Sequence, residues 1–131
     1  MEAYPGFRVG VFAGGRLMKF EFSPYVAIQV GDHAKAVDFY KRVLGMDFIE
    51  ERGNDAYLDK DGINFVIENN PEGIGSVFFE FKTDNLAEAK QALLAENCTI
   101  TQEYNEHSIM FSDPFGMNFH IWEEGAFPDN P

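Results

Sequence analysis

The sequence has little cysteine, little positive charge and no long apolar run. Its single cysteine, Cys98, cannot form an internal disulfide, and no Cys/His cluster indicates structural zinc; both features fit a cytoplasmic protein. Ten Lys and Arg stand against 22 Asp and Glu, and the net charge of −12 disfavours nucleic acid as a partner. No run of about 18 apolar residues exists, which argues against insertion into a membrane.

The N-terminal residues 1–22 are predicted to be a peripheral extension. Their apolar stretch, residues 9–13, is too short for the core of a signal peptide, and no A-x-A cleavage site follows it. The pair Gly14-Gly15 could be encoded by purine-rich codons that form a bacterial ribosome-binding site, so we hypothesise that translation starts at Met18. Mass spectrometry of the natively expressed protein would refute this hypothesis by detecting the upstream residues.

Apolar and aromatic residues are abundant, at 45% and 15% of the chain, and include 14 Phe. This composition supports a packed core, and the length suits one domain. The sequence also repeats itself. GINFVIE at 62–68 matches GMNFHIW at 116–122, an offset of 54, and GDHAKA at 31–36 matches DNLAEA at 84–89, an offset of 53. Two matches at nearly one offset indicate an internal duplication.

Each half has the pattern of a strand, a helix and three further strands. We expect Asp32 and Asp84 to cap the two helices, which should end at Gly45 and near Asn97. Turn residues separate the predicted strands, which are 25–30, 47–52, 56–58, 63–68, 77–82, 99–104, 108–112 and 118–123. The prediction is one α+β domain with module one at 23–70, module two at 75–125 and a C-terminal tail at 126–131.

Two short motifs carry a resemblance to a known family. VDFYKRVLG at 37–45 is similar to an "FY…vLG" helix end, and DPFGMN at 113–118 is similar to a "DP.G" turn before a last strand. With the duplication, they make residues 24–124 resemble the vicinal oxygen chelate superfamily, which includes glyoxalase I, bleomycin-resistance proteins and extradiol dioxygenases. The resemblance implies two tandem βαβββ modules whose curved mixed sheets surround a small-molecule cavity, and a homodimer. Phe39, Tyr40 and Leu44 are expected in the core.

Metal-dependent members of this superfamily carry His, Gln or Glu ligands on the first and last strands of each half. The resemblance places these positions at Tyr25, Val66, Phe78 and His120, and only His120 is a good ligand. A divalent ion in such enzymes needs about three protein ligands. We therefore predict that no metal binds at the usual position.

Neighbouring residues on the same strand faces could line the cavity instead, because residues i and i+2 of a strand share a face. The predicted ligand-binding residues are Tyr25, Gln29, Glu68, Phe78, Glu80, Asn118, His120 and Trp122. A displaced divalent-metal site formed by His120, Glu80 and Glu68 stays open as an alternative. His33 and His107 are expected at the surface, and the sequence shows no Ser/His/Asp pattern.

Three functions are consistent with these residues. The first is a metal-free, cytoplasmic binding protein for a small cationic or aromatic ligand, because aromatic faces attract cations and buried carboxylates need a counter-charge. The second is a metal-dependent lyase, isomerase or dioxygenase with a displaced site around His120. The third is an enzyme without a metal that uses His120 as a general base.

Overall fold

The computed structural model describes residues 12–13 and 15–126. Its two α-helices are α1 (His33–Arg42) and α2 (Leu86–Ala95), and a short 3-10 helix covers Pro71–Gly73. The strands are β1 (Phe12–Ala13), β2 (Arg16–Leu17), β3 (Phe20–Val30), β4 (Asp47–Arg52), β5 (Asp55–Lys60), β6 (Ile63–Asn69), β7 (Val77–Thr83), β8 (Thr99–Asn105), β9 (Ser108–Ser112) and β10 (Asn118–Glu123).

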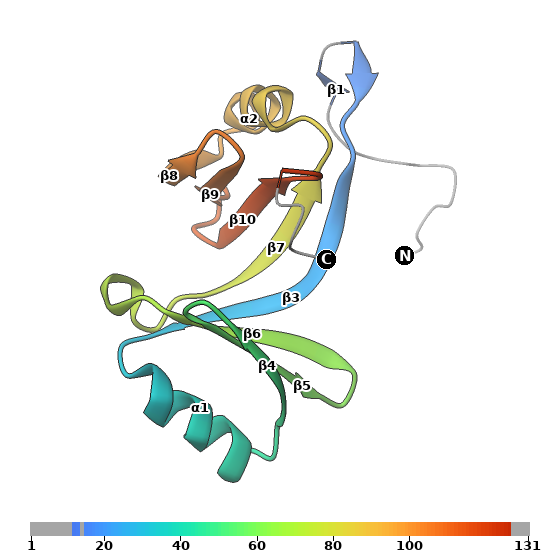
Figure 1. Ribbon diagram of the computed structural model, residues 1–131. Helices are drawn as coiled ribbons and strands as arrows, with labels where there is room; N and C mark the ends of the chain where they lie inside the picture. Colours follow the sequence, from blue (N-terminus) through green and yellow to red (C-terminus); the bar gives the residue numbers. More distant parts are fainter. Residues whose placement is uncertain (1–11, 14, 127–131) are drawn as a thin grey trace, which may run out of the picture.

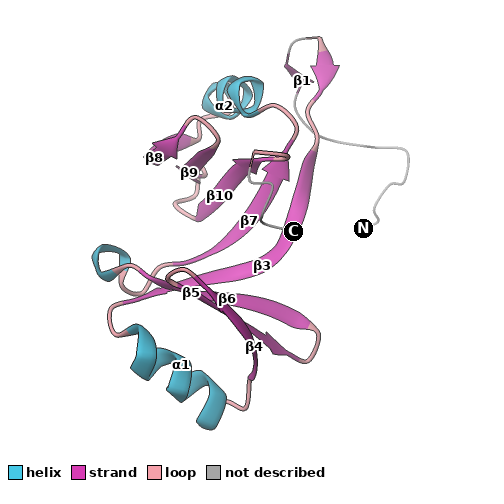
Figure 2. Ribbon diagram, viewed as in Figure 1, coloured by secondary structure: helices cyan, strands magenta, loops and turns pink. Residues whose placement is uncertain are grey.

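The predicted duplication is confirmed by the order of the elements. A strand, a helix and three strands occur twice, from β3 to β6 and from β7 to β10. All eight strands form one mixed sheet in the order β4-β5-β6-β3-β7-β10-β9-β8. The pairs β3–β6 and β7–β10 are parallel, and the antiparallel pair β3–β7 joins the modules at the centre of the sheet. Figures 1 and 2 show the curved sheet, with α1 and α2 beside opposite ends of it.

Side-chain caps define where both helices begin. Asp32 accepts a hydrogen bond from the backbone N–H of Lys35 at 3.2 Å, as predicted. In the second helix the cap is Asn85, which accepts from the Glu88 N–H at 3.1 Å, so the prediction of Asp84 was one residue too early. Gly45 follows α1 with φ 73°, a left-handed conformation that favours glycine after a helix.

The two helices are buried to different depths. Leu86, Ala89 and Ala92 of α2 are buried against the second half of the sheet. None of the ten described residues of α1 is buried, and its contacts are made by a narrow stripe of partly buried residues, Ala36, Val37 and Tyr40. The prediction that Phe39 and Leu44 lie in the core is wrong, since 46% and 47% of their surfaces are exposed. The Phe39 ring packs edge to face against Tyr40, with centroids 5.6 Å apart, and Leu44 comes two residues after the end of α1 at Arg42.

Both helices pack on the same face of the sheet. Under α1 lie Ala56, Leu58 and Ile67, and under α2 lie Ile109, Phe111 and Ile121. Because side chains alternate along a strand, the intervening residues point to the opposite, helix-free face. That face therefore holds the positions that the sequence predicts for a ligand.

The predicted start of module one, residue 23, lies within a continuous strand. Strand β3 starts at Phe20, and Met18 is 3% exposed within the core cluster under α2. The predicted boundary of module one thus falls inside β3. Most of the predicted extension, residues 1–11 and 14, lies outside the described residues. No helix in the described part of the chain is long and apolar enough to cross a membrane.

Candidate functional site

Two adjoining hollows lie on the helix-free face, and together they form a cup. Their volumes are about 490 and 660 Å³. Both are lined by Asp55, Glu68, Ser108 and His120, so the four side chains mark the boundary that the hollows share. The floor is apolar and consists of Ala27, Val66, Phe78 and Met110, with Tyr25 and Tyr57 packed against it.

The register of the sheet sets the side chains of the cup in rows across neighbouring strands. In module two, β10 lies between β9 and β7, and its cup-facing residues are His120 and Trp122. The two rows are Met110–His120–Glu80 and Ser108–Trp122–Lys82. In module one, β6 lies between β5 and β3, and the equivalent rows are Tyr57–Val66–Ala27 and Asp55–Glu68–Gln29.

Three carboxylates line the cup, those of Asp55, Glu68 and Glu80, and two cationic side chains, Arg52 and Lys82, line its hollows as well. The pKa of Glu68 is raised to about 7, chiefly by burial; Glu80 and Asp55 add to the rise, while a hydrogen bond from Gln29 and the proximity of His120 oppose it. Gln29 donates that bond through Nε2 at 2.9 Å. The pKa of Asp55 is raised as well, first by burial and then by Glu80. Ionisation of Glu68 and Asp55 is therefore less favourable in the folded protein than in water.

His120 stands between a hydroxyl and a carboxylate. Its Nε2 lies 2.7 Å from Ser108 Oγ, within hydrogen-bond distance. On the other side, Nδ1 lies 3.5 Å from Glu80 Oε2 and makes no hydrogen bond. The ring of His120 also meets the edges of Phe78 and Tyr104. Both side chains are largely enclosed, with 15% of the His120 side chain and 13% of the Glu80 side chain exposed.

Aromatic side chains from both modules, Tyr25, Tyr57 and Trp122, form walls of the larger hollow. The Tyr25 and Tyr57 rings meet edge to face with centroids 5.3 Å apart. Burial, followed by the charge of Asp55, raises the pKa of Tyr57 to about 12, so its hydroxyl stays protonated at neutral pH. Trp122 donates from Nε1 to Ser23 Oγ at 3.2 Å, and Lys82 Nζ lies 5.9 Å from the Trp122 ring centroid.

The structure brings seven of the eight predicted ligand-binding residues to this cup. The exception is Asn118, which lines a smaller hollow of about 240 Å³ beside Gln29 and Tyr104. Sequence reasoning missed Asp55 and Tyr57 on β5, Ser108 on β9 and Tyr104 on the edge strand β8. Pairing β5 with β6 and β9 with β10 in register would have found Asp55 and Ser108, because they face Glu68 and Trp122.

The superfamily's metal does not fit the residues present. At its four ligand positions, Val66 and Phe78 are 3% and 4% exposed and packed in the apolar floor, where they offer no donor atom. No three His, Cys, Asp or Glu among the described residues are grouped to hold an ion, and this finding includes the displaced set of His120, Glu80 and Glu68. Of the four positions, Val66 and Phe78 thus offer no ligand, and His120 is the good one.

The remaining two histidines lie outside the cup. The His33 side chain is 15% exposed and its Nε2 is 3.1 Å from the Ile67 carbonyl oxygen, so the prediction of a surface position is wrong for this residue. The predicted surface position agrees better with His107, whose side chain is 41% exposed and whose Nδ1 lies 2.7 Å from Glu123 Oε1.

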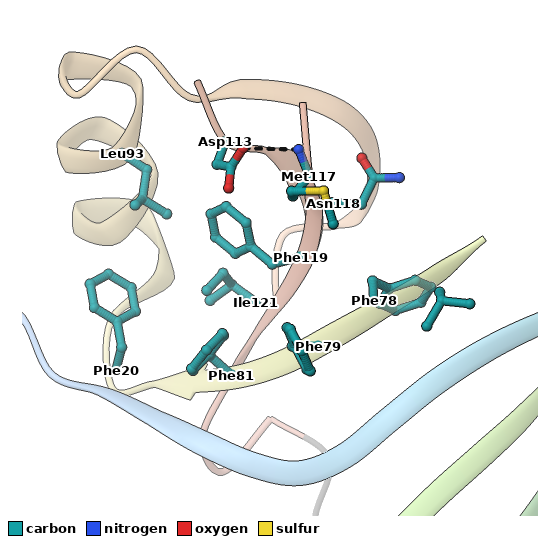
Figure 3. Close-up of a pocket in the computed structure, with 11 residues that line it drawn as sticks. Phe20, Phe78, Phe79, Phe81, Leu93, Asp113, Met117, Asn118, Phe119 and Ile121 are labelled. Atoms are coloured by element: carbon teal, nitrogen blue, oxygen red, sulfur yellow. Dashed lines mark hydrogen bonds between the residues drawn. The ribbon is translucent and has the colours of Figure 1, made fainter. Parts of the chain in front are cut away.

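A second cavity lies on the opposite face, beside α2. Its volume is about 520 Å³, and Figure 3 shows the apolar side chains that surround it. They include Phe20, Phe79, Phe81, Leu93, Met117 and Phe119. Asp113 is the charged residue in this lining, and its carboxylate accepts from the Met117 N–H at 2.9 Å. The cleft therefore offers apolar surface, whereas the titratable chemistry is in the cup.

Solved structures share this fold at low sequence identity. An extradiol ring-cleaving dioxygenase from B. fuscum is 20% identical over 82% of this chain and 33% of its own, with a TM-score of 0.55. A structure described as an NAD-dependent benzaldehyde dehydrogenase from Legionella pneumophila is 19% identical over 75% of this chain and 96% of its own, with a TM-score of 0.60. A superfamily member from Vibrio splendidus 12B01 is 20% identical over 82% and 99%, with a TM-score of 0.50.

This chain spans about a third of the dioxygenase, and at such identities the likeness concerns the fold alone. Among curated proteins, none matches the chain. The sequence model described as Glyoxalase/Bleomycin resistance protein/Dioxygenase superfamily matches residues 23–121, which include both modules, and the chain therefore belongs to this superfamily.

Proposed function

We propose that the cup binds a small cationic ligand with an aromatic ring, and that this binding needs no metal ion. The observation that carries the proposal is the cluster of Asp55, Glu68 and Glu80, in which burial and neighbouring carboxylates raise the pKa of Glu68 to about 7. A cation among these groups would add positive charge beside the carboxylates, beyond that of Arg52 and Lys82, which also line the two hollows. The net charge of −12 also attracts cations from solution.

The size and walls of the cup support the same ligand class. Volumes of about 490 and 660 Å³ fall within the range of roughly 300–1,000 Å³ that is usual for small-molecule sites. Tyr25, Tyr57 and Trp122 line one hollow together with Glu68 and Glu80. Aromatic faces bind cations electrostatically and give flat ligands a complementary surface.

A metal-dependent lyase, isomerase or dioxygenase is the weaker candidate. The dioxygenase relatives suggest it, but apolar Val66 and Phe78 take the place of donor atoms. Binding of an organic cation requires no donor atom at those two positions. The donor chemistry of the cup therefore favours the organic cation over the metal.

A thermal-shift experiment tests the proposal, with benzyltrimethylammonium as the probe and benzyl alcohol as its neutral control. We expect the ammonium compound alone to raise the Tm, since a ligand present at about 100 times its Kd adds about 2.7 kcal/mol of stability. Glu68→Gln should weaken this shift. The matched control is Glu103→Gln, which removes the same charge from a surface pair with Lys90 at 2.9 Å.

The proposal fails if benzyltrimethylammonium at high excess leaves the Tm of the wild-type protein unchanged. It also fails if Glu68→Gln and Glu103→Gln reduce the shift equally, because general surface charge would then explain the binding. The homodimer and the cytoplasmic location stay predictions. Light scattering of the purified protein measures the first, with a particle of twice the chain's mass as the expected result.

A further inference from the structure

Three side chains on adjacent strands of module two form a continuous line in the cup. Ser108 Oγ lies 2.7 Å from His120 Nε2, and His120 Nδ1 lies 3.5 Å from Glu80 Oε2. A hydroxyl, an imidazole and a carboxylate in this order are the parts of a nucleophile activated by a base and oriented by a third group. Apart from His120, the set is separate from the superfamily's four ligand positions.

The sheet explains why these three residues meet although they are far apart in sequence. His120 on β10 is directly opposite Glu80 on β7 and opposite Met110 on β9. Ser108 comes two residues before Met110, so it shares the cup face and is the diagonal neighbour of His120. Diagonal neighbours on one face are about 7–8 Å apart at the backbone, which a histidine side chain can bridge.

The surroundings favour the tautomer of a neutral His120 that a general base requires. A carboxylate accepts hydrogen bonds and cannot donate them, so Nδ1 of a neutral His120 carries its proton on the side that faces Glu80. Nε2 then has a free lone pair and accepts from the Ser108 hydroxyl. The Nδ1 atom is buried without a hydrogen-bond partner, and Glu80 is the carboxylate in reach. Such contacts are often long in ligand-free sites and shorten in the reactive complex.

We propose that Ser108 is an acyl-accepting nucleophile and that the cup hydrolyses small carboxylic esters. Ser108 Oγ forms a bond to the ester carbonyl carbon while its proton passes to His120 Nε2. The bond from that carbon to the leaving alkoxide then breaks, and His120 returns the proton to the alkoxide, which leaves as an alcohol. A water molecule, deprotonated by His120, attacks the acyl-serine and releases the acid and the free hydroxyl. Glu80 is a positioning residue that stabilises the imidazolium in both halves.

The site is accessible to such a substrate. Ser108 and His120 line both hollows of the cup, so a carbonyl group can approach Oγ from the cavity. This activity uses the same cup as the proposed cation binding, but it depends on the Ser108–His120–Glu80 line and not on the charge of the ligand. The two proposals can therefore fail separately.

Covalent labelling with diisopropyl fluorophosphate tests the nucleophile. The reagent forms an oxygen–phosphorus bond with an activated serine and loses fluoride, and intact mass spectrometry counts the label while peptide mapping locates it. We expect one label per chain, on Ser108, and a burst of p-nitrophenol when p-nitrophenyl acetate is the substrate. Ser108→Ala should abolish both signals, and His120→Ala should slow labelling by about 10²–10⁴-fold. Glu80→Gln should slow it less.

Ser112→Ala is the matched control, because Ser112 is on the same strand and lies near the Asp113 carbonyl instead of His120. Its labelling rate should equal that of the wild-type protein. An unlabelled wild-type Ser108, or a label mapped to another residue, overturns the proposal without reference to the folding of any variant. If labelling fails while benzyltrimethylammonium still raises the Tm, only the esterase inference falls. The reverse result removes only the cation-binding proposal.

Discussion

The two modules have the same strand register and different chemistry at matched positions. Where module two sets His120 opposite Glu80, module one sets Val66 opposite Ala27. Where module one sets Glu68 opposite Asp55, module two sets Trp122 opposite Ser108. The repeat therefore determines which positions are opposite one another, while the residue types at those positions differ between the modules. Module one supplies the carboxylates of Asp55 and Glu68, and module two supplies the hydroxyl–imidazole–carboxylate line.

The helices show the same divergence on the other face. The first residue of α2 is Leu86, which is 1% exposed, while the first residue of α1 is His33, which bonds to the Ile67 carbonyl. Module two thus closes its core with aliphatic packing, and module one uses a polar contact at the matched position. The difference predicts that the two helices contribute unequally to stability.

The largest effect is expected from truncating these matched residues. Leu86→Ala should lower the free energy of unfolding by about 2–5 kcal/mol, because it opens a cavity in the core under α2. His33→Ala removes one hydrogen bond and should cost about 1 kcal/mol. Urea denaturation of both variants measures the difference. Equal losses would show that the helices are anchored alike, contrary to the comparison.

The raised pKa values of the module-one carboxylates, Glu68 and Asp55, should make the stability of the protein depend on pH. The ordinary pKa of Glu68 is 4.5 and its folded value is about 7, so the folded state binds more protons than the unfolded state between these values. The stabilisation that comes from protonated Glu68 is therefore fully present below pH 4.5. It is lost as the pH rises to 7, which lowers the free energy of unfolding by up to about 3 kcal/mol for such a shift. Asp55 shifts in the same direction and adds to the decline.

Glu68→Gln should flatten this decline and stabilise the protein at pH 8, because the amide cannot ionise. Glu103→Gln, on the surface and paired with Lys90, should keep the wild-type slope. Denaturation midpoints at pH 5, 6, 7 and 8 give the comparison. A wild-type slope retained in Glu68→Gln would mean that the carboxylate is not the group whose protonation stabilises the cup.

Much of the fold was readable from the sequence because duplication is a pattern in the chain itself. GINFVIE and GMNFHIW aligned Val66 with His120, and the structure confirms that both occupy the same place in their modules. The cap at Asn85 and the exposure of Phe39 were not predicted, since each depends on a local choice between neighbouring residues or on how deeply a helix is seated.

The site was less predictable because its chemistry depends on pairing between strands. Ser108 lies in no recognisable sequence motif. It is a candidate site residue because it is diagonally opposite His120 on the neighbouring strand. The sequence showed no Ser/His/Asp pattern for the same reason, because the third member is a glutamate on a strand that is remote in the chain. The set of Ser108, His120 and Glu80 can be identified only from the register between the strands, and not from the composition of the sequence.

The smallest effect is expected when module two is given the residue of module one. His120→Val copies Val66 and should destabilise the protein by about 1 kcal/mol, because the enclosed Ser108 hydroxyl loses its partner. Ser108→Ala in the same chain should restore most of that loss, since removing both partners of a buried hydrogen bond can be nearly neutral. A double-mutant cycle by urea denaturation isolates this coupling. If the two losses simply add, Ser108 and His120 are not energetically coupled, and the hydroxyl is held by other contacts than the imidazole.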